Sequence, residues 1–169
     1  MVSVSVPQET KEEEKIETKD LAHEVRESLR IQALVADVGA KMGFKAWLPR
    51  NDRGRVQALM EANASCLLEN LPLNYDETTI KTIEQIDVLW LKGRSIARAF
   101  EIEHSTSIYS GILRMADLLA LQPNMDIKLH IVAPYEDETR YSRKYGGRFS
   151  RCSTEGPWLI AAHSSHMTV

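Results

Sequence analysis

The chain has 169 residues with 43% hydrophobic and 27% charged side chains, and its formal net charge is −3. This length suits one domain with a tail, and the composition is that of an ordinary globular protein. No apolar run is long enough to span a membrane, and the N-terminus lacks the apolar stretch of a signal peptide. Cys66 and Cys152 form no motif with each other, which excludes a disulfide scaffold, so we expect a reducing, cytoplasmic setting.

The charge is distributed unevenly along the chain. Residues 1–20 hold six acidic and three basic side chains, whereas the other 149 residues hold 18 of each. Within the latter, residues 140–151 carry five basic side chains and no acidic one. Nucleic-acid-binding domains are usually basic. The acidic average nevertheless leaves a DNA partner open, because its whole excess lies in the first twenty residues.

The N-terminal third is predicted to be a tail, a helix and a short strand. Residues 1–17 can bury little apolar surface, so we expect a disordered acidic tail there. An amphipathic helix follows, with Thr18 as its N-cap, apolar residues at i, i+4 spacing, and Gly43 at its end. The apolar run over 44–48 then predicts a short strand.

The stretch 50–82 has the mixed pattern of a peripheral insertion. Residues 51–55 are rich in polar residues and glycine, which is typical of a turn. Residues 56–71 show some helical periodicity, and residues 72–77 are predicted to be a loop. We therefore expect one short helix in this stretch.

Two alternating segments, 83–91 and 96–103, predict a β-hairpin with a turn at 92–94. In a regular strand this alternation places Ile96 and Phe100 on one face and the acidic residues on the other. The hairpin would supply the two central strands of the sheet.

A helix from about residue 105 to 121 and a buried strand over 127–133 complete the pattern. The order helix, strand, insertion, strand, strand, helix, strand predicts an α/β fold, in which helices flank a small mixed β-sheet. Its core order is αβββαβ, and its domain spans residues 18–135. The last strand, helix and strand form a right-handed crossover.

Residues 136–169 are polar, charged and predicted to be irregular. Suitable synonymous codons from Arg143 onward allow a different peptide to be read, without a stop, in a frame two nucleotides on. We therefore interpret the end of the chain, from about residue 143, as the product of a frameshift or a truncated gene. A genuine divergent tail is the alternative, and the nucleotide sequence distinguishes the two.

Three carboxylates form the candidate site. Glu101 and Glu103 are two apart on a strand, so they share one face. A three-residue turn would place Asp87 opposite Ala99 and diagonal to Glu101, whereas a two-residue turn would put Asp87 on the other face. Buried acids are costly unless a cation such as Mg²⁺ or Mn²⁺ compensates them, and such an ion can activate water. The alternative is a solvated face whose acids pair with lysine or arginine.

These segments resemble a known nuclease family. The runs IDVLW over 86–90 and AFEIEH over 99–104 are similar to the PD-(D/E)XK superfamily of restriction-endonuclease-like folds. That family has an Asp on one strand, Asp/Glu-x-Lys on the next, then a helix and a strand. Asp87 and Glu101 match the pattern, but Glu103 stands where lysine is usual, which makes this an ExE variant. The resemblance covers roughly residues 20–135.

The resemblance implies a Mg²⁺- or Mn²⁺-dependent endonuclease that hydrolyses DNA phosphodiester bonds. Asp87 and Glu101 would ligate the metal, with the carbonyl of Ile102 as a further ligand. Glu103 would position the attacking water or complete the metal shell, and the usual lysine base is missing. Three more residues are candidates for contact with a phosphate or for support of the site: His104, Ser107 and Arg114.

These supporting residues and the whole site have other interpretations. His104 can be a structural histidine, and Arg114 can form a salt bridge with Glu103 or Asp117. The departure at Glu103 also allows a catalytically inactive relative that serves as a DNA-binding or assembly module. A generic α/β interaction domain is the third alternative. The partners implied are DNA, a domain or subunit that supplies specificity, and a second copy in a homodimer, with no membrane.

Overall fold

A computed structural model describes residues 11–61, 64–103, 108–121, 127–134, 149–151 and 158–163 of the chain. Its elements in chain order are α1 (Lys11–Lys41), β1 (Lys45–Trp47), α2 (Arg50–Gln57), the short 3-10 helix η1 (Ala64–Cys66), α3 (Glu77–Ile83), β2 (Val88–Lys92), β3 (Ser95–Ile102), α4 (Ile108–Leu121), β4 (Lys128–Pro134), β5 (Phe149–Arg151) and β6 (Trp158–His163). Within these ranges no helix combines the length and apolar character needed to cross a membrane.

The strands form one mixed sheet in the order β1-β2-β3-β4-β6-β5. β3 and β4 are parallel and are connected through α4, whereas the other neighbouring strands are antiparallel. The predicted α/β fold with the core order αβββαβ is confirmed, since α1, β1, β2, β3, α4 and β4 follow one another in this order. α2 and α3 are inserted between β1 and β2.

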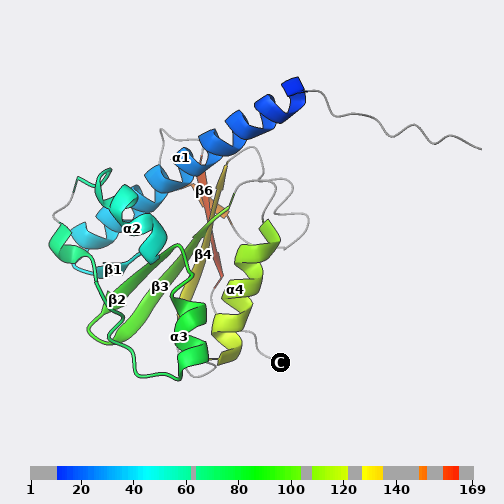
Figure 1. Ribbon diagram of the computed structural model, residues 1–169. Coiled ribbons are helices and arrows are strands. Elements are labelled where there is room, and N and C mark those ends of the chain that lie inside the picture. The colour runs from blue at the N-terminus through cyan, green and yellow to red at the C-terminus, as the bar shows by residue number, and fades with distance from the viewer. Residues whose placement is uncertain are drawn as a thin grey trace, which may run out of the picture.

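Helices cover both faces of the sheet (Figure 1). α1 and α2 pack on one face, where their apolar residues join Val88, Phe100 and Val132 in one cluster. α3 and α4 pack on the other face, where Met115 and Leu118 of α4 belong to a second cluster. A sheet that is covered on both sides buries nearly all of its central strands. An acidic side chain on β3 is therefore removed from water unless it lies at a strand end.

Trp90 fixes the position of α1 on the sheet. Its indole Nε1 donates a hydrogen bond to the carbonyl of Val35, at 3.2 Å. Gly39 permits this contact, because a Cβ at that position would lie 2.5 Å from Nε1 and 2.7 Å from the ring carbon Cε2. The indole also belongs to a row of neighbouring rings that crosses the sheet: Phe44, Trp90, Phe100 and His130.

The secondary structure near both ends of the chain differs from the prediction. α1 begins at Lys11, so the predicted disordered tail over 1–17 is wrong for its last seven residues, and residues 1–10 lie outside the described ranges. Glutamate and lysine are good helix formers, and acids near a helix N-terminus are favourable. The segment predicted to be irregular, 136–169, contains β5 and β6, because β6 pairs with the open edge of β4.

The insertion contains two helices that the sequence pattern did not reveal as such. The predicted turn at 51–55 lies inside α2, which follows Pro49, and the predicted helix over 56–71 is limited to the end of α2 and η1. α3 ends at Ile83, the first residue of the segment predicted as a strand, and residues 84–87 form a turn, so β2 begins only at Val88. The missed signal is Asp76, an N-cap whose carboxylate accepts a hydrogen bond from the N–H of Thr79 at 3.0 Å.

The turn between β2 and β3 has two residues, so the three-residue turn predicted at 92–94 is wrong. Lys92 pairs with Ser95, and Gly93 adopts a φ of 63°, a conformation that glycine reaches without steric cost. In a regular hairpin this turn would place Asp87 on the opposite face from Glu101.

A β-bulge restores the shared face. The pairing shifts by one residue in the middle of the hairpin, where Ala97 is the extra residue of β3. Beyond the bulge Val88 pairs with Phe100, so the same register continued by one residue brings Asp87 opposite Glu101. The expected position of Asp87 opposite Ala99 is therefore wrong by two residues, but the expected common face of Asp87 and Glu101 holds.

Candidate functional site

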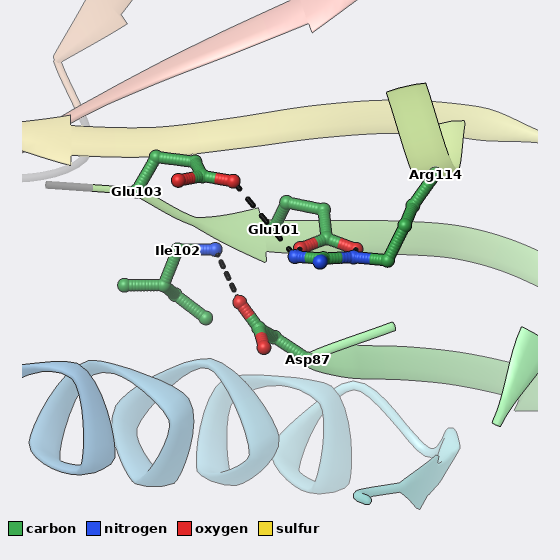
Figure 2. Close-up of polar contacts among 5 residues, drawn as sticks. All are labelled: Asp87, Glu101, Ile102, Glu103 and Arg114. Carbon is green, nitrogen blue, oxygen red and sulfur yellow. Dashed lines mark hydrogen bonds and ion pairs between the residues drawn. The ribbon is translucent and has the colours of Figure 1, made fainter. Parts of the chain in front are cut away.

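Asp87 lies immediately before β2 and completes the hydrogen bonding of β3. Its Oδ2 accepts a hydrogen bond from the N–H of Ile102 at 2.8 Å (Figure 2). The next N–H, that of Glu103, bonds to the carbonyl of Val132 in β4 at 2.9 Å. Alternate N–H groups of a strand point to opposite neighbours, so the N–H of Ile102 faces β2. The carboxylate of Asp87 thus takes the place of a strand carbonyl. The hydrogen bond from the N–H of Ile102 holds it there.

Glu101 and Glu103 are buried beneath α4. Their exposed fractions are 0% and 2%. α4 passes over them at Gly111, where a Cβ would lie 2.0 Å from Oε1 of Glu103 and 3.2 Å from Cβ of Glu101. A side chain larger than hydrogen at this position would therefore displace either the helix or the carboxylate. Glu101 and Glu103 point to the same face because the side chains of a strand alternate. Gly111 lets α4 approach closely, so both acids lie in one space that is shielded from solvent.

Arg114, one turn after Gly111 on α4, enters this space from the side (Figure 2). Its Nε and one terminal nitrogen donate to the two carboxylate oxygens of Glu101, at 3.0 and 2.6 Å. The same terminal nitrogen lies 3.9 Å from Oε1 of Glu103. The salt bridge considered for Arg114 is therefore present, but its main partner is Glu101.

Three carboxyl groups share one arginine in this site. Burial raises the pKa of Asp87 to about 6, although the hydrogen bond from Ile102 acts in the opposite direction. Burial also raises the pKa of Glu101 to about 8, in spite of its bidentate contact with Arg114. The pKa of Arg114 is raised in turn, first by its hydrogen bonds to Glu101. A further cation near these three acids would relieve the cost of their burial.

The carboxylate oxygens of this site are of the kind that a hard divalent ion prefers, but in this structure Asp87 and Glu101 already have hydrogen-bond partners. Carboxylate oxygens are the ligands that Mg²⁺ and Mn²⁺ prefer. Both oxygens of Glu101 accept hydrogen bonds from Arg114, and Oδ2 of Asp87 accepts one from the N–H of Ile102. Accordingly, no group of three His, Cys, Asp or Glu side chains is arranged to hold a metal ion in the described part of the chain. Carboxylate oxygens of the kind that such an ion prefers are present, but those of Glu101 are bonded to the guanidinium of Arg114.

Two predicted residues cannot be placed in the site, and one buried histidine was not predicted. His104 and Ser107 fall within residues 104–107, outside the described ranges. Sequence reasoning did not single out His130, which is 6% exposed and has a pKa lowered to about 4 by burial and by the nearby Arg98. His130 stacks on Phe100, whose cluster faces α1, so it lies across the sheet from the acids.

The raised pKa of Glu101 predicts that the metal-free protein loses stability as the pH rises. A carboxyl that is harder to ionise when folded stabilises the fold at low pH, and this stability is lost as the pH rises through its folded pKa. From about pH 6.5 to 8.5 we expect a loss of about 2 kcal/mol in the free energy of unfolding. His130 is uncharged in the folded protein over this window, because its folded pKa is lowered to about 4. In the unfolded chain it is about half protonated at about pH 6.5, so it adds a small effect of opposite sign at the lower end of the window.

Urea unfolding in EDTA across this window measures the effect. Glu101→Gln is the control, because it removes the titrating group, and it should flatten the pH profile. A stability that rises with pH in the original chain would contradict the prediction.

Comparison with known proteins places these residues in a restriction enzyme context. Residues 5–146 match the family described as the type II restriction enzyme NmeDI C-terminal domain. The type II restriction enzyme NmeDI of Neisseria meningitidis serogroup C is 30% identical to this chain over 123 residues, which are 68% of this chain and 35% of that protein. The chain therefore spans about a third of the length of this relative. No solved structure matches the chain.

Proposed function

This chain belongs to the type II restriction enzyme NmeDI C-terminal domain family, and on that premise we propose that it is a metal-dependent endonuclease that hydrolyses DNA phosphodiester bonds. The observation that carries the proposal is the pair Glu101 and Glu103, buried beneath α4 with Asp87 beside them. Two fully buried acids and the partly buried Asp87, set against one arginine, are an unfavourable arrangement. A site that binds a divalent cation gives a reason for this arrangement.

The roles of the residues follow from their positions. Asp87 and Glu101 would hold Mg²⁺ or Mn²⁺, with the carbonyl of Ile102 as a further ligand. When bound, the ion would supply Lewis-acid stabilisation of the phosphate and a lowered pKa for a water molecule. Glu103, two residues after Glu101 and without the usual lysine, would orient that water and accept its proton.

DNA is the proposed partner, but the chain after residue 20 has no surplus of basic groups with which to hold it. Outside residues 1–20 the acidic and basic side chains are equal in number. Because phosphate neutralisation supplies most of the non-specific affinity for DNA, this domain alone would bind DNA weakly. We propose that a partner domain or subunit, in a homodimer or a larger assembly, supplies the specificity.

Cleavage of supercoiled plasmid by the purified chain tests the proposal. We expect conversion to nicked and linear DNA with Mg²⁺ or Mn²⁺ and no conversion in EDTA. Low salt and plasmids of diverse sequence compensate for weak binding and for the unknown target. Cleavage that continues at the same rate in EDTA would contradict metal dependence.

A catalytically inactive relative is the second candidate, and one observation favours it. Arg114 occupies both oxygens of Glu101, the buried acid at the centre of the proposed site. Such a domain would retain the fold and act in DNA binding or assembly. A mobility shift of duplex DNA by the purified chain, together with no cleavage in Mg²⁺ or Mn²⁺ at the same concentrations, would support this candidate over an endonuclease.

A further inference from the structure

Arg114 and a divalent ion would compete for the same two oxygens. The guanidinium contacts Oε1 and Oε2 of Glu101 at 3.0 and 2.6 Å. A cation coordinated by either oxygen would lie within a few ångströms of this guanidinium, where two positive charges repel strongly in a poorly solvated space. Glu101 is fully buried, so its carboxylate has little room to turn away from this guanidinium.

Arg114 is the member of the pair that can leave. Its side chain is 30% exposed, whereas that of Glu101 is 0% exposed. An arginine at the border between a buried acid and solvent can turn outward on its flexible stem, while its Cα remains on α4. A phosphate accepts the same bidentate contact that a carboxylate accepts. A phosphate that approaches the exposed side of Arg114 is therefore a chemically equivalent second partner.

We propose that Arg114 is a positioning residue that exchanges partners. In the free protein it holds Glu101 and keeps divalent ions out, and in the complex it turns to a DNA phosphate and releases Glu101. This inference rests on the proposed function and adds regulation to it. Metal binding and DNA binding then strengthen each other, because thermodynamic coupling between two ligands is reciprocal.

The first test is the binding of Mn²⁺ to the full chain without DNA, followed by calorimetry and by the shift of the thermal unfolding midpoint. Arg114→Met removes the guanidinium and keeps a stem of similar length. We expect Arg114→Met to bind Mn²⁺ about tenfold more tightly than the original chain, which corresponds to about 1.4 kcal/mol. Equal or weaker binding would overturn the proposal.

Two comparisons separate local competition from a general charge effect. Arg50→Met removes an exposed arginine that pairs with Glu84 at 3.8 Å, and it should change the Mn²⁺ affinity by less than about twofold. In a Glu101→Gln background, Arg114→Met should no longer increase the affinity, because the contested oxygens are changed. An undiminished increase in that background would overturn the assignment to Glu101.

Arg114→Lys keeps the proposal testable if the methionine variant fails to fold. An ammonium group makes a point contact in place of the bidentate pair, so we expect a Mn²⁺ affinity between those of the original chain and Arg114→Met. An affinity equal to that of the original chain would count against competition. These binding measurements do not depend on cleavage, so they separate the two proposals. A chain that cleaves no DNA but shows the expected affinities would refute the proposed endonuclease function and support competition between Arg114 and Mn²⁺ for Glu101.

A short DNA duplex tests the other half of the exchange. The duplex should increase the Mn²⁺ affinity of the original chain more than that of Arg114→Met, because only the original chain has an arginine to transfer. The same increase in both chains would overturn the transfer of Arg114 to a phosphate.

Discussion

Glu101→Gln is expected to reduce metal-dependent DNA cleavage by about 100-fold or more, because a metal contributes several kcal/mol of transition-state stabilisation and each 1.4 kcal/mol is a factor of about ten. The amide keeps the size of the side chain but provides a weak, neutral ligand. The fold should survive, since burial already raises the pKa of Glu101 to about 8 and a neutral group is tolerated there. Loss of activity and loss of structure are thus separable at this position.

The measurement compares initial rates of plasmid cleavage for Glu101→Gln, Asp87→Asn and the original chain, with circular dichroism as the check on folding. Glu77→Gln is a matched control, because it makes the same chemical change at a helix position whose side chain is 83% exposed. This control should cleave at the original rate. Cleavage that survives both site substitutions would refute the assignment of the active site.

Gly39→Ala is expected to destabilise the protein by about 2–3 kcal/mol, although alanine is the better helix former by about 1 kcal/mol. The added Cβ would lie 2.5 Å from Nε1 of Trp90. The indole cannot yield easily, because it is 5% exposed and bonded to the carbonyl of Val35. The helix must therefore move away from the sheet, which weakens the packing between α1 and β2.

Gly54→Ala is the matched control for this prediction. Gly54 also lies within a helix, and a Cβ at its position meets nothing within 4 Å. We expect this variant to be more stable than the original chain by up to about 1 kcal/mol. Urea unfolding at one pH measures both variants. A Gly39→Ala protein as stable as Gly54→Ala would contradict the close packing of α1 on Trp90.

Local patterns predicted much of the fold. The i, i+4 spacing ending at Gly43 predicts the main part of α1, and the alternation around Phe100 predicts β3. The insertion was harder, because α2 and α3 are short and polar and carry little periodicity. Asp76 in the N-cap position is a signal that could have revealed α3, although most residues of that helix are β-branched. The strands β5 and β6 depend on pairing with β4, which no local pattern announces.

The register of the hairpin shows why alternation alone was insufficient. Ile96 and Ala99 belong to the same apolar cluster on the α4 face. They are three residues apart, an odd spacing that in a regular strand would put them on opposite faces. The bulge at Ala97 resolves this conflict, so the expected grouping of Ile96 with Phe100 is wrong. The position of a bulge reflects packing on both faces of the sheet, and a single strand does not contain that information.

That Glu101 and Glu103 share a face follows from their spacing alone, because the side chains of a strand alternate with a period of two. The αβββαβ order can be read in the same way, since each main element carries its own hydrophobic period. The contacts by which Asp87 joins these acids and Arg114 holds Glu101 arise from packing between separate elements. These contacts depend on a bulge and on the path of α4 over Gly111, which are settled when separate elements pack together.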